Sequence, residues 1–180
     1  DGNAVVVFSP ETTAELGRFA LPRQRSGNRY CIADFFNDLS NGTPTDVLPM
    51  QAVTMGEEAS RFSQSLFAAD AYSDYLYFHG LAVQMAEALA EWTHARIRRE
   101  CGFPDPQGMA LRDVLAQRYR GSRYSFGYPA CPNVADSRQQ LEWLDADRIG
   151  LTMDESDQLH PEQSTTALVA LHSKARYFSA

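Results

Sequence analysis

The sequence predicts an α+β domain with a largely antiparallel sheet and long flanking helices, on three observations. Short strand-like segments gather toward the two ends of the chain, and a long segment without proline lies between them. Helical segments do not alternate one-for-one with strands, which disfavours a doubly wound parallel sheet. The 180 residues are about one domain's worth and can bury a core of their own.

The N-terminal third has the pattern of short strands separated by turn residues. Strands are predicted within 3–10, 17–24 and 47–55, and the segment 29–36 is also rich in β-forming residues. The loop predicted at 37–46 is dense in Asn, Gly, Pro and Asp. Pro49 cannot donate a ladder hydrogen bond, which indicates an edge strand or a bulge.

The middle of the chain is predicted to be helical, because 57–100 contains one Gly and no Pro. A break near Asp70 or Ser73 would start a second helix. Along that helix a set of apolar residues recurs at three- and four-residue steps and so lies on one face: Phe78, Leu81, Met85, Leu89 and Trp92. Shorter helices are predicted at 109–119 and 135–144, followed by strands at 148–153 and 164–172.

Composition excludes several classes of protein. A formal net charge of -7 argues against a general nucleic-acid binder, and no apolar run is long enough to span a membrane. Three cysteines without zinc-ligand spacing indicate a reduced, cytoplasmic setting. The chain begins with Asp1 rather than Met, which suggests a piece of a longer protein.

Common catalytic patterns are absent from the sequence. The four histidines, at 79, 94, 160 and 172, show no metal-binding spacing, so no metal site is expected. No nucleophile elbow, Walker loop or dinucleotide fingerprint occurs. Cys131 has no evident group that would lower its thiol pKa, so a structural cysteine is the expected interpretation and a cysteine-dependent enzyme is disfavoured.

The segment "RYSFGYPACP" at 123–132 is the most unusual in the chain. Its two prolines and one glycine are too rigid for a linker, and its pattern is too poor for a core strand. We expect residues 128–131 to be nearly extended and to form a wall for a ligand. Arg123 suits a carboxylate, and the faces of Tyr124, Phe126 and Tyr128 suit an aromatic base or a sulfonium. The alternative is a loop packed on the core with Arg123 in a surface ion pair.

Six blocks resemble a known family. "YRGSRYSFGYPACP" contains the pattern RxxxGYPACP, and "HGLAVQMAEALAEWTHARIRRE", "FALPRQ", "CIADFF", "LHPEQST" and "KARYFSA" stand in the family's order. Together they resemble the C-terminal activation domain of cobalamin-dependent methionine synthase, from about Arg18 to the end of the chain. The resemblance implies that 1–180 is this one module, excised from a longer enzyme, with a C-shaped α+β fold around a twisted antiparallel sheet.

The resemblance also implies a function. The module would bind S-adenosylmethionine and support reductive methylation of oxidised cob(II)alamin during methionine biosynthesis. Cobalamin would be held mainly by a neighbouring module of the same enzyme, and a flavodoxin-like donor would supply an electron. The isolated chain would bind its ligand without catalytic residues of its own, as part of a methyltransferase, with no nucleic acid or membrane as partner.

Site residues follow from the resemblance one at a time. Arg123 would bind the methionine carboxylate, and the backbone of Gly127, Tyr128 and Pro129 would line the ligand. Tyr177, followed by Phe178, would contact it near the C-terminus.

Two carboxylates are placed in the site by the same resemblance. Glu87 would line it, with an exposed helical glutamate as the alternative. Asp34 would hold the ligand's amino group, with a turn-capping carboxylate as the alternative. His160 and Gln163 would face the cobalamin or only cap a strand.

A second function class stays open at this point. The chain could be a docking module that recruits a flavodoxin-like donor without binding the methyl donor. Its acidic balance slightly disfavours an acidic partner, unless arginines form a local patch.

Overall fold

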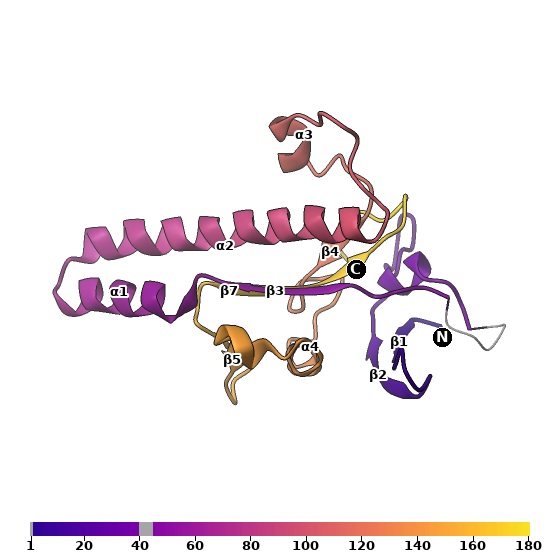
Figure 1. Ribbon diagram of the computed structural model, residues 1–180, viewed down its shortest axis with the longest axis horizontal. Coiled ribbons are helices and arrows are strands. Elements are labelled where there is room, and N and C mark those ends of the chain that lie inside the picture. The colour runs from indigo at the N-terminus through magenta and orange to yellow at the C-terminus, as the bar shows by residue number, and fades with distance from the viewer. Residues whose placement is uncertain (1, 40–44) are drawn as a thin grey trace. The chain divides into compact units, whose positions relative to one another are not determined.

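The computed structural model describes residues 2–39 and 45–180, which form two compact units (Figure 1). The first contains the N-terminal segment to Pro49, Ala95–Asn133 and Leu168–Ala180. The second contains Met50–His94 and Val134–Ala167. Helices and antiparallel strands occur in one chain without strict alternation, so the predicted α+β class is confirmed.

A hairpin opens the first unit. Strand β1 (Ala4–Phe8) pairs antiparallel with β2 (Glu15–Ala20), with Ala4 opposite Ala20. Val5 and Phe19 face each other across the pair and are buried, which fixes the register by burial of one face. The two strands predicted from turn-flanked apolar runs are confirmed.

The segment after the hairpin differs from its prediction. The β-rich residues at 29–36 contain a 3₁₀ helix, η1 (Ile32–Phe35), and no strand. The backbone N–H of Cys31 donates to the Asp34 carboxylate at 2.9 Å, a local side-chain bond that favours a turn over a strand. Of the loop predicted at 37–46, residues 40–44 lie outside the described residues.

The rest of the first unit is built around a buried arginine. Arg98, in the last turns of helix α2 (Tyr72–Glu100), is fully buried and pairs with Asp105 at 2.6 Å. Its guanidinium lies 4.0 Å from the centre of the Tyr119 ring. Helix α3 (Leu111–Leu115) lies between Asp105 and Tyr119 in the sequence and is shorter than the helix predicted at 109–119.

Strand β7 (Ser164–Ala170) is central in a three-stranded sheet of order β3-β7-β4. Within the first unit, its residues 168–170 pair antiparallel with β4 (Ser122–Tyr124). Within the second unit, β3 (Met50–Thr54) is an edge strand that begins directly after Pro49, as predicted. The expectation that "RYSFGYPACP" contributes no core strand was wrong for its first two residues.

Two helices follow β3 and confirm the predicted break. Helix α1 (Gly56–Ala68) ends before Asp70, which has a positive φ of 56°, and α2 begins at Tyr72. Ring contacts join α1 to the first turns of α2, Phe62 to Phe78 at 4.7 Å and Phe67 to Tyr75 at 5.3 Å. The pair is therefore a helical hairpin inside the second unit.

Helix α2 buries small residues and exposes large ones. Ala82, Ala86 and Ala90 are buried, four residues apart. The apolar face identified from the sequence lies elsewhere on the helix, and its Leu81 and Trp92 are 59% and 60% exposed. The periodicity was right, but alanine permits the closer approach to the interior.

The remaining elements close the second unit. They are α4 (Asp136–Leu144), η2 (Ala146–Ile149), β5 (Thr152–Met153) and β6 (Leu159–His160). Their core consists of Leu141, Ala146 and Leu151. The buried Gln140 amide donates to the Ala167 carbonyl at 2.7 Å, which links α4 to β7 within this unit. The strand predicted at 148–153 is reduced to its last two residues.

Among the described residues, no helix is both long enough and apolar enough to cross a bilayer.

Candidate functional site

The signature segment begins in strand β4, and the residue directly before this strand, Gly121, has a conformation and surroundings that favour glycine. Gly121 has φ of +85°, and a Cβ there would lie 3.0 Å from the Ala170 carbonyl oxygen and 3.4 Å from the Arg98 side chain. This close approach seats β4 against β7. In β4, Ser122 and Tyr124 are buried and Arg123 between them is half-buried, as strand alternation requires. Arg123 is thus the residue of the strand that remains partly open to solvent.

After β4 the chain forms a tight turn closed by three hydrogen bonds. The Gly127 N–H donates to the Cys131 carbonyl and the Cys131 N–H donates to the Tyr128 carbonyl, both at 2.9 Å. The Cys131 thiol donates to the Ser125 carbonyl at 2.9 Å. The expectation that 128–131 is nearly extended was wrong, because Pro129 and Ala130 occupy the centre of a four-residue turn.

The turn has an exposed tip between buried ends. Phe126, Ala130 and Cys131 are buried, whereas Gly127, Tyr128 and Pro129 are exposed. Gly127 has φ of 91°, which a residue with a side chain rarely adopts. The turn therefore holds three exposed residues on buried anchors and presents them in a fixed conformation.

Buried aromatic residues pack against the signature segment. The Phe126 ring lies 5.0 Å from that of Phe19. The Tyr124 hydroxyl donates to the Arg176 carbonyl at 2.8 Å, and burial is the main reason that its pKa rises well above the ordinary value. Phe178 is buried, with its ring 6.0 Å from Tyr124. Phe178 thus anchors the C-terminal segment and leaves its neighbour Tyr177 as the exposed residue.

Tyr177 belongs to the same surface as the turn. Its side chain is 45% exposed. Partial burial raises its pKa first, and the neighbouring Cys131 and Tyr128 raise it further. Tyr177 and Tyr128 therefore lie within electrostatic range of each other, although they are 49 positions apart in the sequence.

Asp34 lies in the first unit but already has partners. Its carboxylate forms a bidentate ion pair with Arg23, at 2.6 and 2.7 Å, and accepts the Cys31 N–H. The hydrogen bonds from Arg23 are the main reason that the pKa of Asp34 lies below its ordinary value. Its neighbour Phe35 contacts the aromatic support, with its ring 6.4 Å from Phe178. A shallow pocket of about 580 Å³ is lined by Asp34 together with Arg23, Arg29, His172 and Lys174.

Glu87, the other predicted carboxylate, belongs to the second unit. It is exposed on helix α2, between the buried Ala86 and the exposed Leu89. Its part in the ligand site stays a prediction.

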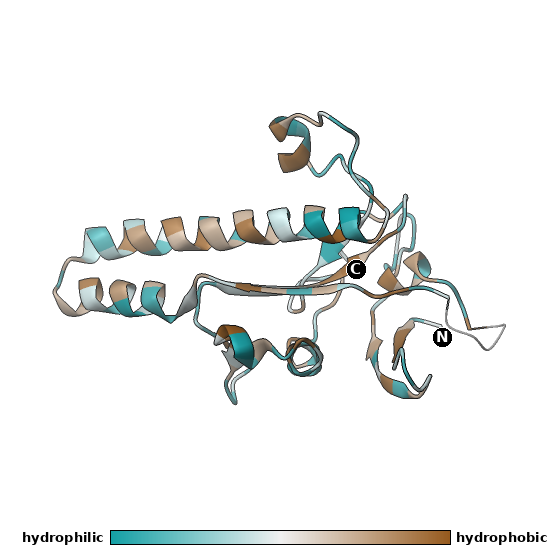
Figure 2. Ribbon diagram, viewed as in Figure 1, coloured by the Kyte–Doolittle hydropathy of each residue, from teal (hydrophilic) through white to brown (hydrophobic). Residues whose placement is uncertain are grey.

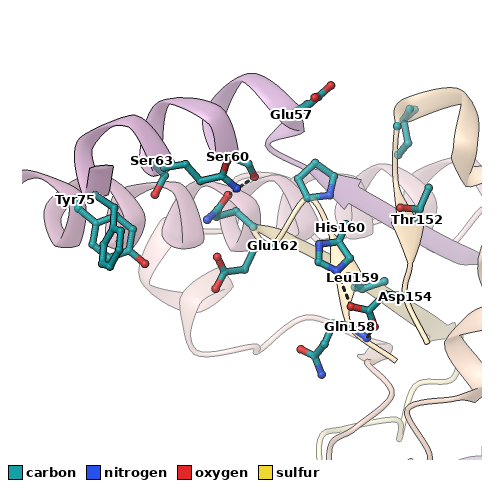
Figure 3. Close-up of a pocket in the computed structure, with 16 residues that line it drawn as sticks. Glu57, Ser60, Ser63, Tyr75, Thr152, Asp154, Gln158, Leu159, His160 and Glu162 are labelled. Atoms are coloured by element: carbon teal, nitrogen blue, oxygen red, sulfur yellow. Dashed lines mark hydrogen bonds and ion pairs between the residues drawn. The ribbon is translucent and has the colours of Figure 1, made fainter. Parts of the chain in front are cut away.

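A second candidate region is an open cleft of about 970 Å³ within the second unit (Figure 3). Helix α1 contributes one wall, and the segments around β5 and β6 contribute the other. The apolar lining includes Phe67, Tyr75 and Leu159, and the acidic lining includes Glu57, Asp154 and Glu162. Of its residues, the sequence had singled out only His160 and Gln163.

Two hydrogen-bond systems hold the polar side of this cleft. His160 Nε2 and Asp154 Oδ2 are 2.8 Å apart, and this bond is the main reason that the Asp154 pKa lies below its ordinary value. The buried Gln163 accepts from Ser60 at 3.2 Å and bonds to His79 Nδ1 at 3.2 Å. Gln163 is therefore a buried part of the lining. His160 is an exposed part of it, bonded to Asp154 (Figure 3).

In the part of the chain that the structure describes, no group of three or more His, Cys, Asp or Glu side chains is close enough to hold a metal ion.

Comparisons with known proteins give a consistent result. A family model described as "Vitamin B12 dependent methionine synthase, activation domain" matches residues 1–180. Methionine synthase of Mycobacterium tuberculosis (strain ATCC 25618 / H37Rv) is 45% identical over 190 residues, which cover 99% of this chain. That of Mycobacterium leprae (strain TN) is 44% identical over 189 residues, again 99% of the chain. The chain spans only 16% of the length of either relative.

The fold also matches a solved structure. "Crystal Structure of the MetH Reactivation Domain bound to AdoHcy" aligns with a TM-score of 0.88 at 24% identity, over 99% of this chain and 57% of that chain. This likeness confirms the α+β architecture.

Proposed function

Because the chain belongs to the family of vitamin B12-dependent methionine synthase activation domains, we propose that it binds S-adenosylmethionine and positions its methyl group for transfer. The observation that carries the proposal is the signature surface, which we define as Arg123, Gly127, Tyr128, Pro129 and Tyr177. It combines a half-buried arginine, an exposed rigid turn and two exposed tyrosine side chains in one unit. We expect the chain alone to bind its ligand and to catalyse no turnover.

The groups of the ligand match this surface. Its carboxylate suits Arg123, whose planar guanidinium can bind two oxygens at once. The sulfonium and the adenine suit the faces of Tyr128 and Tyr177. AdoHcy, named with the reactivation domain of the same fold, shares the carboxylate, ammonium and adenine but lacks the methyl group and the charge on sulfur. The aromatic faces should therefore favour S-adenosylmethionine over AdoHcy.

The ammonium group has two proposed partners in the chain. Glu87 is exposed on α2, and Asp34 is held by Arg23. Asp34 would have to bind the ammonium while it remains paired with Arg23. Glu87→Gln and Asp34→Asn distinguish the two candidates, because removing the charge of the true partner should weaken ligand binding and removing the other charge should not.

In this proposal the chain works by positioning. The sulfonium already activates the methyl group, so the protein needs to fix its direction and no nucleophile of its own. Cobalamin on a neighbouring module, reduced by an electron from a flavodoxin-like donor, would supply the nucleophile. The buried Cys131 thiol is engaged with the Ser125 carbonyl and takes no part. Three unbridged cysteines support placement in the reducing cytoplasm.

We assign the cleft of the second unit to the approach of the cobalamin module. Its size and its open, mixed polar and apolar lining suit the edge of a large cofactor better than a buried small molecule. His160→Ala should then reduce remethylation in the intact enzyme and leave binding of S-adenosylmethionine by this chain unchanged.

Equilibrium dialysis with labelled S-adenosylmethionine tests the binding function. We expect saturable binding that unlabelled AdoHcy displaces and that methionine displaces poorly, because methionine lacks the adenine and the sulfonium. The docking alternative predicts no retained label, together with a complex between this chain and a reduced flavodoxin-like protein. Retention that no competitor reverses would contradict both.

A further inference from the structure

The C-terminal segment that carries Tyr177 has no regular secondary structure to hold it. Strand β7 ends at Ala170, and residues 171–180 form neither a helix nor a strand. In Figure 2 β7 turns brown toward its end, where its residues are buried, so the sheet fixes the chain as far as that point. Beyond it, two carbonyls of the segment accept hydrogen bonds from side chains. The position of Tyr177 therefore depends on side chains elsewhere in the first unit.

The main chain is held directly before and after Tyr177. The Arg176 carbonyl accepts from the Tyr124 hydroxyl at 2.8 Å. Phe178 is buried, and its ring lies 5.9 Å from that of Tyr30. These two contacts fix the neighbours of Tyr177, but the chain beyond Phe178 needs an anchor of its own.

Gln24 supplies that anchor. Its side-chain N–H donates to the Ser179 carbonyl at 2.7 Å, two residues after Tyr177. Its side-chain oxygen accepts the Tyr30 N–H at 3.0 Å, which fixes the orientation of the amide, because only the nitrogen is then left to donate. The Gln24 N–H also donates to the Tyr30 carbonyl at 2.9 Å. The side chain is therefore fixed by its own loop before it reaches Ser179.

Gln24 also gives a role to a sequence block that the proposed function leaves unused. The block "FALPRQ" ends with Arg23 and Gln24. Arg23 binds Asp34 of "CIADFF" with two hydrogen bonds, at 2.6 and 2.7 Å, and Gln24 binds Ser179 of "KARYFSA". Two adjacent residues thus join three segments that lie far apart in the sequence.

We propose that Gln24 is a positioning residue of the ligand site, which holds Tyr177 in place through the Ser179 carbonyl. This role rests on the proposed binding of S-adenosylmethionine by the signature surface, to which Tyr177 belongs. A ring that is fixed before the ligand arrives loses less conformational entropy on binding. Gln24 is only half-buried, so loss of its bond to Ser179 should weaken ligand binding and leave the fold intact.

Two substitutions separate the bond to Ser179 from the bond to Tyr30. Gln24→Glu keeps an acceptor for the Tyr30 N–H and loses the donor to Ser179, so the Kd for S-adenosylmethionine should rise roughly fivefold or more. Gln24→Lys keeps a donor for Ser179 and loses the acceptor, so the Kd should change less. Because S-adenosylmethionine carries a net positive charge, the introduced charges alone would have the opposite effect. Gln107→Glu, at an exposed residue of the same unit, is the matched control and should leave the Kd unchanged.

A double-mutant cycle shows whether Gln24 acts through Tyr177. Tyr177→Ala should weaken binding by itself, and Gln24→Glu should then have little further effect, because the ring that Gln24 holds in place is absent. A general loss of structure would instead weaken binding by the same factor in both backgrounds.

Hydrogen exchange measured by mass spectrometry tests the position of the segment without any ligand. Peptides from residues 171–180 should exchange faster in Gln24→Glu than in the unaltered chain, and Gln107→Glu should not change their exchange. Circular dichroism confirms that each variant is folded. If the new charge of Gln24→Glu unfolds the chain, Gln24→Met takes its place, because it removes the same donor without adding a charge.

Four results would overturn this role of Gln24. They are unchanged exchange in Gln24→Glu, an unchanged Kd, a larger loss of affinity in Gln24→Lys than in Gln24→Glu, and equal losses with and without Tyr177. If the unaltered chain binds no S-adenosylmethionine, the proposed function itself fails, and the exchange measurement alone decides whether Gln24 holds the segment.

Discussion

The signature surface of the first unit and the cleft of the second are built in opposite ways. Four residues of the signature surface come from one short segment, strand β4 and the tight turn after it, which is anchored by buried Phe126, Ala130 and Cys131. The cleft is lined by side chains from segments that lie far apart in sequence, 57–67, Tyr75 and 149–163. The exposed side chains of His160 and Asp154 in this cleft are joined by one hydrogen bond.

This difference explains what each region can do. A turn fixed by main-chain hydrogen bonds and by a positive φ at Gly127 keeps its shape before the ligand arrives, so binding costs little ordering entropy. An open cleft with exposed side chains at its rim adapts to a large partner, at the cost of ordering those side chains. We therefore expect substitutions to have large effects on the first region and small ones on the second.

The largest loss of unfolding free energy should come from replacing Arg98, the buried arginine of the first unit. Arg98→Met leaves the Asp105 carboxylate without the partner that lies 2.6 Å away, and removes the guanidinium from Tyr119. Breaking a buried ion pair on one side costs about 3–5 kcal/mol of unfolding free energy. Urea unfolding should show this loss, and Arg96→Met, an exposed arginine on the same helix, is the control. Equal losses for the two variants would mean that burial does not matter here.

Arg123→Ala should remove most of the affinity for S-adenosylmethionine without unfolding the chain. Loss of one side of a charged hydrogen-bonded pair costs about 2–5 kcal/mol, or about thirtyfold or more in Kd. Arg120→Ala is the matched control, because Arg120 stacks on Phe103 and lies three residues earlier. Unchanged affinity in Arg123→Ala would remove this residue from the site.

Tyr124→Phe should have an intermediate effect. It leaves the ring in the aromatic support but removes the hydroxyl that donates to the Arg176 carbonyl. Loss of this partly buried hydrogen bond should cost about 1 kcal/mol of unfolding free energy. Tyr177, which follows Arg176 in the chain, should lose part of its fixed position. Thermal unfolding measures the first effect, and weaker ligand binding reports the second. Weaker stability with unchanged binding would show that Tyr177 does not depend on this anchor.

Asp34→Asn should have the smallest effect on stability, and one that depends on pH. The folded-state pKa of Asp34 is lowered, so its ion pair with Arg23 contributes above the ordinary carboxyl pKa of about 3.9 and is lost as pH falls through the folded value. Because the pair is partly exposed, it contributes about 0.5–1 kcal/mol at neutral pH. Urea unfolding at several pH values should show the two proteins converging in acid. A constant difference at all pH values would contradict this origin.

Much of the fold follows from the sequence, because local chemistry and tertiary packing agree there. The β1–β2 hairpin, the break before α2 and the edge position of β3 after Pro49 all have local signals. The secondary-structure prediction failed at two segments whose conformation depends on hydrogen bonds to residues elsewhere in the chain. Ser122–Tyr124 becomes a strand because β7 pairs with it, and 32–35 becomes a 3₁₀ helix because Asp34 binds Arg23 and the Cys31 N–H.

The two candidate regions also differ in how far the sequence predicted them. The signature surface has a sequence signal because four of its five residues lie within the segment 123–129. Its pairing with Tyr177 came only from resemblance, and the cleft had no signal beyond His160 and Gln163. The sequence correctly identified an apolar face on α2. It did not show that this face is exposed, because the buried side of the helix is formed by alanines and not by the leucines.

Calorimetric titration of the chain with S-adenosylmethionine tests the central claim most directly. We predict saturable binding of one ligand per chain, with heat that disappears in Arg123→Ala and persists in Arg120→Ala. Absence of heat and of thermal stabilisation at millimolar ligand, in a chain that is folded by circular dichroism, would contradict the claim that the signature surface is a ligand site.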